Sequence, residues 1–284
     1  MPYLRNYQQR KTNYRTRNTG QDSDTDDTHS VHSSLSHGAS TLFSQDDRSS
    51  VSSGPVAVHV LPHRGEGLRF RPENVYPDRF TLADIEVPRG PWVYLACPGS
   101  RRKCPHCKVH VSHDDHIVVA VDGACLKNGQ DGARSSYGVF WGHNNVLNTA
   151  VPVEGEGNHT NQVAELRACM RALLDVVHVR SLFEDQGIIL SAVVIKSDSE
   201  YLVRGVTEWL PKWKRNGWKN SRGLDVANWE HFKAIERLTE DLERHKLTIK
   251  FWHVPRRNNR DADTMAKAVL RGAWNRGLGL LPPF

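Results

Sequence analysis

Ile117-Val118-Val119-Ala120-Val121-Asp122-Gly123 is an apolar run that ends in an acid and a glycine. A short, bounded run rich in β-branched residues is typical of a buried strand. The pattern recurs in Val193-Val194-Ile195-Lys196-Ser197-Asp198-Ser199, where Asp198 again follows the apolar residues. Because strand ends of an α/β fold can converge on one point, Asp122 and Asp198 are candidates for a shared site.

Two further acids stand at the starts of helical patterns. Glu165 belongs to Thr160-Asn161-Gln162-Val163-Ala164-Glu165, and Asp263 opens Asp263-Thr264-Met265-Ala266. A cluster of carboxylates without sulfur or imidazole suits Mg²⁺ better than zinc. The alternative is structural. Asp122 and Asp198 would then be turn formers at strand ends, Glu165 a partner of the helix dipole and Asp263 a helix cap.

The periodicity of the chain predicts an α/β fold. Strands are expected over residues 117–122, 137–141, 146–153, 192–198 and 247–254, and helices over 161–178, 199–209, 229–244 and 262–271, with Thr160 as an N-cap. Three consecutive strands followed by helical crossovers predict a mixed five-stranded sheet with helices on both faces.

The remaining residues divide into segments of different composition. Residues 1–54 are rich in Ser, Thr, Asp, Asn and Arg and predict a disordered tail, in line with a mean hydropathy of −0.57. Residues 55–116 hold apolar pieces broken by Pro and Gly and predict a poorly defined extension. Residues 117–272 are expected to form the folded domain, and 273–284 a C-terminal tail.

Charge and cysteine content narrow the partners and the compartment. A net charge of +6 and a pI near 9.1 favour a polyanionic partner. Five cysteines without a secretory signal indicate a reducing, intracellular compartment, nuclear or cytoplasmic. The basic, acid-free first 20 residues favour a plain basic tail and leave a mitochondrial transit peptide as the alternative. No apolar stretch approaches the roughly 18 residues of a spanning helix, and we expect a monomer without a membrane partner.

A possible zinc site lies before the first strand. Cys104-Pro105-His106-Cys107 has the spacing of a zinc knuckle, and Cys97 precedes it. A tetrahedral site would combine Cys97, Cys104 and Cys107 with His110 or His113. The alternative is that these cysteines remain unligated thiols, since no second clear pair completes a finger signature.

Five motifs in order resemble type 1 ribonuclease H of the cellular kind. They are Val121-Asp122-Gly123-Ala124-Cys125 with Asn128-Gly129, Thr160-Asn161-Gln162-Val163-Ala164-Glu165-Leu166, Ser197-Asp198-Ser199, the basic helix-loop Trp213-Lys214-Arg215-Asn216-Gly217-Trp218-Lys219, and Ala262-Asp263. The resemblance covers residues 117–271, about 155 of the 284. Any one of these motifs is weak, but all five in this order are a strong signal.

The resemblance implies a chemistry. It implies a ribonuclease H-like fold and hydrolysis of the RNA strand of an RNA–DNA hybrid, leaving 5′-phosphate and 3′-hydroxyl ends. It also implies two Mg²⁺ ions, replaceable by Mn²⁺. In this assignment Asp122 bridges the two ions, Glu165 and Asp198 bind one of them, and Asp263 binds the other.

The resemblance also implies contacts with both strands of a hybrid. Asn128, Asn161 and Gln162 match positions that read RNA sugars and bases. The matches to the DNA-strand channel and phosphate pocket are Thr160, Tyr201, Trp209, Trp213, Ser221 and Asn228. Independently, five basic residues and no acid lie between Lys212 and Arg222, interleaved with tryptophans, which suits a phosphate backbone through residues such as Lys214, Arg215 and Lys219. The alternative is an amphipathic helix that packs its tryptophans in the core.

One departure concerns the final connection. The family usually carries a histidine in a glycine-rich loop before the last acid, whereas this chain has only Pro255-Arg256-Arg257-Asn258-Asn259-Arg260-Asp261. Two other functions stay open. One is an inactive hybrid-binding module of the same fold, and the other is a related nuclease that acts on a different duplex.

Overall fold

A computed structural model describes residues 67–103, 105, 108–155 and 159–272. The predicted tails, 1–54 and 273–284, lie outside the described residues. The elements are α2 (Pro72–Val75), α3 (Leu82–Ile85), β1 (Glu86–Arg89), β2 (Trp92–Ala96), β3 (Ser112–Leu126), β4 (Arg134–Phe140), β5 (Thr149–Pro152), α4 (Asn161–Glu184), β6 (Ala192–Ser197), α5 (Glu200–Arg204), α6 (Leu210–Arg215), α7 (Trp229–Arg244), β7 (Thr248–His253) and α8 (Arg260–Leu270).

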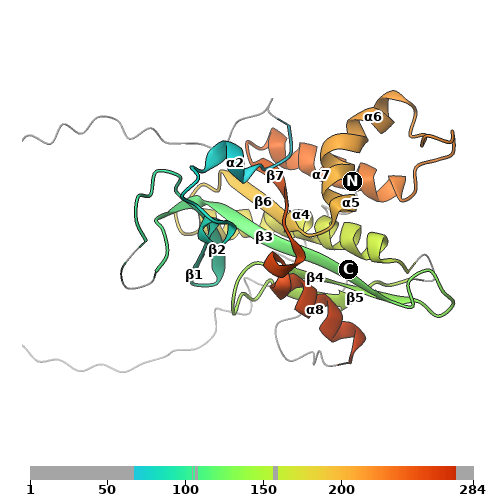
Figure 1. The fold of residues 1–284 in the computed structure, drawn as a ribbon, viewed down its shortest axis with the longest axis horizontal. Coiled ribbons are helices and arrows are strands. Elements are labelled where there is room, and N and C mark those ends of the chain that lie inside the picture. The colour runs from blue at the N-terminus through green and yellow to red at the C-terminus, as the bar shows by residue number, and fades with distance from the viewer. Residues whose placement is uncertain (1–66, 104, 106–107, 156–158, 273–284) are drawn as a thin grey trace, which may run out of the picture. The chain divides into compact units, whose positions relative to one another are not determined.

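The long strand β3 is the centre of a mixed sheet (Figure 1). It runs parallel to β6, with Val118 opposite Val194, and β6 runs parallel to β7. Its second half pairs antiparallel with β4, with Asp122 opposite Gly138, and β4 pairs with β5. Parallel strands are normally covered on both sides, and all six residues of β6 are buried here.

Helices cover both faces of this sheet, and two glycines bring them close. A Cβ on Gly123 would lie 2.3 Å from the backbone nitrogen of Glu165 in α4. A Cβ on Gly138 would lie 2.6 Å from the backbone oxygen of Ala262 in α8. Gly138 faces the same side as its partner Asp122, and successive strand residues point to opposite sides. The helices α4 and α8 therefore pack on opposite faces.

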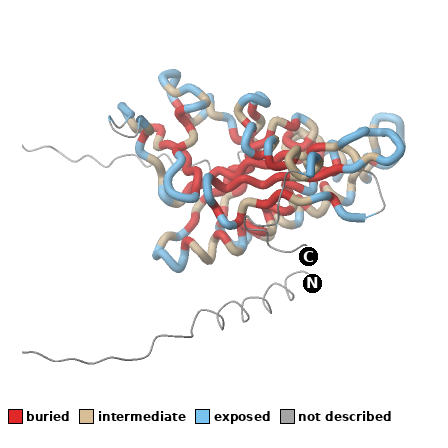
Figure 2. Tube along the Cα trace, turned by 90° about the horizontal axis from the view of Figure 1, so that it is seen from below, coloured by how far each residue is buried: buried red, intermediate tan, exposed pale blue. Residues whose placement is uncertain are grey.

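The buried residues run through the middle of the domain (Figure 2). Helix α4 packs on β3 and β4, and α7 packs on α4. The inner face of α4 packs against the strands through three fully buried side chains, those of Leu166, Leu173 and Val176. Helix α7 buries Phe232 and Ile235 in the same way. The five predicted strands and the predicted helices 161–178, 229–244 and 262–271 are present, although β3 begins five residues earlier than expected and α4 runs on to Glu184. Thr160 caps α4 as predicted, since its Oγ1 accepts a hydrogen bond from Val163 N at 3.1 Å.

Two expectations about the N-terminal side of the domain were wrong. The sheet has seven strands rather than five, because β1 and β2 join it, with Tyr94 of β2 opposite Ile117 of β3. Residues 67–116 therefore belong to the same compact unit as the rest, and the expected boundary at 116 falls inside β3. Pro and Gly flank these short strands, so the local sequence gives only a weak strand signal. The strands are stabilised instead by the pairing of β2 with β3.

A buried ion pair ties this hairpin to the rest of the sheet. Lys196 of β6, 6% exposed, lies 2.5 Å from Glu86 of β1. A buried lysine requires such a partner, since an unpaired charge in the interior is costly.

The segment after β6 differs from the single helix predicted for it. It is divided into α5, a π-helical turn at Gly205–Trp209 and α6.

The contact at Gly123 generates a stability prediction. Replacing Gly123 by Ala should lower the melting temperature by about 2–8 °C, since overpacking against backbone costs about 1–3 kcal/mol. Gly99→Ala is the matched control, because its Cβ would meet only Cys97 Sγ at 3.7 Å. Thermal unfolding followed by circular dichroism measures both. Equal melting temperatures in the two variants would contradict the close approach of α4.

Candidate active site

Four carboxylates, from Asp122, Glu165, Asp198 and Asp263, are brought together by the fold. Asp122 and Asp198 lie two residues beyond Ala120 and Lys196, the last pair of the parallel strands β3 and β6, so they occupy neighbouring positions where this pairing ends. Glu165 lies on the turn of α4 that contacts Gly123. Asp263 lies on the first turn of α8, beside Gly138. The sequence prediction that these acids converge is therefore consistent with the geometry.

Like charges and burial set the electrostatics of this cluster. Asp122 is 4% exposed, and burial together with the charges of Asp198, Asp263 and Glu165 raises its pKa to about 8. Burial also raises the pKa of Glu165 to about 7, with a contribution from Asp198. Such shifts arise when charged carboxylates are crowded away from water. The site therefore favours a bound cation.

The donor set fits a divalent ion with oxygen ligands. Asp122 Oδ2 is buried and has no hydrogen-bond partner among the described residues. Glu165 accepts a short hydrogen bond from Ser199 Oγ, which also caps α5 by accepting from Leu202 N at 3.1 Å. A buried carboxylate oxygen without a donor is the group that a metal ion satisfies. The alternative of separate turn formers and caps does not account for this arrangement.

Basic side chains balance one side of the cluster. Arg256 Nη2 donates to Asp263 Oδ1 at 2.7 Å, and Lys267 Nζ lies 2.7 Å from the same oxygen. Burial alone would raise the pKa of Asp263, but the hydrogen bonds from Lys267 and Arg256 outweigh it and the net shift is downward. Arg256 Nε also lies 4.0 Å from Asp198 Oδ2. Both arginines are exposed, but Arg257 makes no ion pair with the described residues. The short connection thus brings one guanidinium, that of Arg256, to the carboxylates.

Asn259 is a site residue that the sequence analysis missed. It is fully buried, and its Nδ2 donates to Val121 O at 3.0 Å and to Asp198 Oδ1 at 2.7 Å. One amide therefore joins Val121 of β3, the residue after β6 and the start of α8. Its position at the N-cap of α8 was the available signal, since Asn is common there, but its side chain bonds across the fold instead of capping the helix.

The predicted RNA-reading residues lie around the start of α4. Asn128 Oδ1 accepts a hydrogen bond from Asn161 N at 3.1 Å, which joins the turn after β3 to the helix. The side chains of Asn128, Asn161 and Gln162 are all exposed. Asn161 and Gln162 lie about one turn of α4 before Glu165, and Asn128 is hydrogen-bonded to Asn161. They are therefore free to contact a ligand that lies across the carboxylates.

A row of aromatic side chains follows α5, α6 and the loop to α7. Neighbouring ring centroids are 6.0 Å apart for Tyr201 and Trp209, 5.9 Å for Trp209 and Trp213, 6.2 Å for Trp213 and Trp218, and 6.4 Å for Trp218 and Trp229. All five are half-buried. Each ring therefore packs on its neighbours and is only partly covered, and its contact with a nucleic acid stays a prediction. Asn228 Nδ2 donates to the Tyr201 hydroxyl at 3.2 Å, and Ser221 is exposed in the loop.

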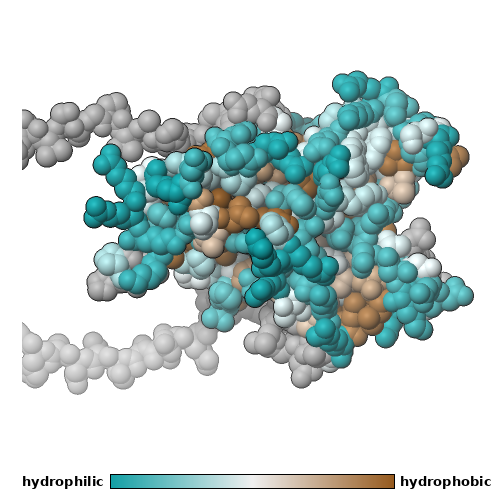
Figure 3. Space-filling view, in the orientation of Figure 1, coloured by the Kyte–Doolittle hydropathy of each residue, from teal (hydrophilic) through white to brown (hydrophobic). Residues whose placement is uncertain are grey.

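The basic helix-loop is partly neutralised, which the sequence did not predict. Lys214 lies 2.5 Å from Glu236 of α7, and Lys219 lies 2.7 Å from Asp225. Arg215, Lys212 and Arg222 are exposed and have no ion pair within the described part of the chain. Figure 3 shows this region at the upper right as a mainly hydrophilic surface with a few apolar residues.

The predicted zinc ligands are only partly described. Cys104 and Cys107 lie outside the described residues, and Cys97 is a half-buried free thiol. His110 is occupied by other contacts, since its Nδ1 lies 3.0 Å from Ser100 Oγ and its ring stacks on Phe80 at 4.4 Å. The zinc site on Cys97, Cys104, Cys107 and His110 stays a prediction. Over the residues with described coordinates, no helix has the length and apolarity needed to cross a bilayer.

Comparison with known proteins gives a consistent result. The profile of the RNase H family matches residues 114–271. Ribonuclease H1 of Homo sapiens is 36% identical over 157 residues, which are 54% of this chain and 49% of the relative. Ribonuclease H of Schizosaccharomyces pombe is 33% identical over 165 residues, 57% of this chain and 55% of the relative. The chain thus spans about half the length of these curated relatives.

A bacterial relative is matched over nearly its whole length. Ribonuclease H of Pseudomonas paraeruginosa is 31% identical over 170 residues, 59% of this chain and 97% of the relative. Among solved structures, LC11-RNase H1 in complex with an RNA/DNA hybrid is 22% identical, with a TM-score of 0.38 over 55% of this chain and 97% of that one. The match to the family covers more than half of the chain and includes every carboxylate of the cluster. The chain belongs to the RNase H family.

Proposed function

We propose that this protein is an endonuclease that hydrolyses the RNA strand of RNA–DNA hybrids and leaves 5′-phosphate and 3′-hydroxyl ends. The observation that carries the proposal is the carboxylate cluster around Asp122, whose buried Oδ2 has no partner among the described residues. Membership of the RNase H family and the similarity to a ribonuclease H1 support the same reaction.

Two Mg²⁺ ions fit this site, and Mn²⁺ is expected to replace them. Asp122 would contact both ions, Glu165 and Asp198 would hold one, and Asp263 the other. When bound, such a pair activates a water molecule and stabilises the leaving oxygen of a phosphodiester. The chain contributes orientation, since Ser199 holds Glu165 and Asn259 holds Asp198. Arg256 neutralises part of the charge on Asp263.

Hybrid recognition is proposed to use two surfaces on either side of the carboxylates. Asn128, Asn161 and Gln162 carry exposed amides beside Glu165 and would bond to 2′-hydroxyls, which only the RNA strand presents. On the other side, the DNA strand would run along Tyr201, Trp209 and Trp213. The faces of these rings would pack on deoxyribose, where a 2′-hydroxyl would intrude. Thr160, Ser221 and Asn228 are proposed to hold the phosphates of that strand.

The proposal is tested with three labelled duplexes. Hybrid, duplex RNA and duplex DNA are incubated with Mg²⁺ or with EDTA, and the products are sized. Mg²⁺-dependent cutting of the hybrid RNA strand alone is the expected result. Binding without cutting would favour an inactive hybrid-binding module, and cutting of another duplex would favour a different nuclease of the same fold.

Removing a carboxylate should separate catalysis from binding. Asp122→Asn or Asp198→Asn should lower the cleavage rate at least about a hundredfold, since the site loses an anionic ligand for the metal. Hybrid affinity should stay close to that of the wild type, because the two recognition surfaces are unchanged. Asp185→Asn, at an exposed acid beyond α4, is the matched control. Rates near normal in both active-site variants would contradict the assigned roles.

The raised pKa of Asp122 predicts a pH dependence of stability in chelator. Its folded pKa, about 8, exceeds the ordinary value of 3.8, so the folded state favours the protonated acid and loses stability as pH rises towards 8. Asn imitates the protonated form and should escape this loss. Between pH 6 and pH 8 the Asp122→Asn variant should therefore gain about 2 kcal/mol on the wild type, or roughly 4–8 °C in melting temperature.

Thermal melts at several pH values check this prediction. Addition of Mg²⁺ should remove the advantage of the variant, since the cation stabilises only the intact site. A constant difference between the two proteins from pH 6 to pH 8 in chelator would show that Asp122 is not crowded by its neighbours.

Salt dependence should identify the cations that contact phosphate. Replacing Lys212, Arg215 and Arg222 together by Ala should reduce the slope of log affinity against log salt by up to about 2–3 units, one counterion for each lost contact. Lys214→Ala with Lys219→Ala should change the slope less, because these lysines already pair with acids. Fluorescence anisotropy on a labelled hybrid measures both variants. The reverse order would show that the ion pairs open on binding.

A further inference from the structure

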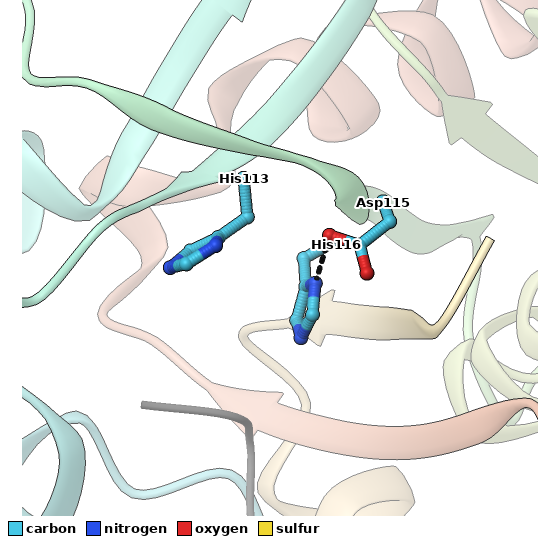
Figure 4. Close-up of side chains that lie close together, drawn as sticks. All are labelled: His113, Asp115 and His116. Atoms are coloured by element: carbon cyan, nitrogen blue, oxygen red, sulfur yellow. Dashed lines mark hydrogen bonds and ion pairs between the residues drawn. The ribbon is translucent and has the colours of Figure 1, made fainter. Parts of the chain in front are cut away.

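The start of β3 carries a group of side chains of the types that ligate metals, far from the carboxylates. His113, Asp115 and His116 each offer a ligand atom, and these atoms lie within 4.8 Å of one another (Figure 4). Asp115 precedes Asp122 by seven residues on one extended strand, so the two groups are roughly 23 Å apart at about 3.3 Å per residue. This group therefore does not belong to the site described above.

An irregularity in the strand pairing brings the two histidines together. Side chains three residues apart on a regular strand point to opposite faces. Between the pairs Tyr94 with Ile117 and Ala96 with Ser112, however, β3 advances five residues while β2 advances two. The extra residues form a bulge, which can redirect a side chain to the other face. The rings of His113 and His116 consequently lie 5.2 Å apart, centroid to centroid.

The hydrogen bonds of the group leave imidazole nitrogens available. His116 Nδ1 donates a hydrogen bond to Asp115 Oδ1 at 2.8 Å. Nδ1 must then carry the proton, which leaves the lone pair of the neutral ring on Nε2. A carboxylate that orients a histidine in this way is typical of metal sites.

His113 provides a second, independent observation. Its Nε2 is buried and has no hydrogen-bond partner within the described residues, although buried polar atoms are nearly always paired. A buried nitrogen without a hydrogen-bond partner is the kind of group that a metal ion satisfies. His116 is itself only 5% exposed.

We propose that His113 and His116 bind one transition-metal ion, with zinc as the expected ion, and that Asp115 orients His116 through its Nδ1. Imidazole ligands suit Zn²⁺ or Co²⁺ and discriminate against Mg²⁺. A bound ion would fasten the bulge at which β2 and the N-terminal hairpin join the central strand. The site uses none of the predicted cysteine ligands, and its existence does not depend on the proposed nuclease activity.

The test measures metal binding to the full chain rather than activity. The metal-free protein is titrated with Zn²⁺ and with Co²⁺ in excess Mg²⁺, which keeps the carboxylate cluster occupied. A background with Cys97→Ser, Cys104→Ser and Cys107→Ser removes the thiol ligands. In this background we expect about one Zn²⁺ per chain, a Co²⁺ spectrum without a thiolate charge-transfer band, and a rise in melting temperature on zinc addition.

Variants of the three residues should remove or weaken this binding. His113→Ala with His116→Ala should abolish it, and Asp115→Asn should weaken it about 10–100-fold with the stoichiometry unchanged. His143→Ala with His245→Ala, at two exposed histidines elsewhere, is the matched control. Because His116 is buried, His113→Gln provides a milder variant whose fold is checked by circular dichroism, and it should weaken zinc binding at least about tenfold.

Two results would overturn the proposal. One is a cysteine-free chain that binds no Zn²⁺ in excess Mg²⁺. The other is a zinc stoichiometry and affinity that the folded His113→Gln variant and the double histidine variant leave unchanged. If the cysteine-free chain does not fold, the same histidine variants are compared in the wild-type background. Loss of a Co²⁺ species without thiolate bands then supports the site, and its absence from the wild type rejects it.

Discussion

The direct contact of two helices with the backbone of one strand pair controls the geometry of this domain. Gly123 and Gly138 lie on adjacent strands and face opposite sides, and each leaves room for a helix backbone where a Cβ would collide. Helix α4 therefore brings Glu165 to the sheet from one face, and α8 brings Asp263 from the other. Asp122, opposite Gly138, lies at the point where these approaches meet.

The cost of this convergence is electrostatic. Three further acids surround the buried Asp122 and raise its pKa to about 8, so the cluster without a cation resists full ionisation. Side chains around the cluster offset part of this repulsion. Asn259 donates to Asp198, Ser199 donates to Glu165, and Arg256 pairs with Asp263. Arg256 lies on the connection where the family usually has a histidine, and it supplies a fixed charge that does not titrate near neutral pH.

The two halves of β3 have different surroundings. Asp122, in the second half, belongs to the carboxylate cluster of the proposed active site, whereas the start of the strand pairs with β2, and the Glu86–Lys196 ion pair links β1 to β6. The proposed metal group at His113 and His116 lies at this junction. The proposed active site and the junction with the N-terminal strands thus lie on the same long strand but use different residues.

The sequence by itself determined the elements and the identity of the four acids. Apolar runs, helical periodicity and the motifs around Asp122 and Asp198 are local signals, and the strands and helices that they predicted were found. Only the tertiary structure decided what depends on distant pairing. Strands β1 and β2 join the sheet through the pairing of β2 with β3, and Lys214 forms an ion pair with Glu236. The Asn259 amide donates to Asp198 instead of capping its helix. The physical reason is that a strand edge, an ion pair or a buried amide is satisfied by residues far away in the chain, and local sequence carries no record of which ones.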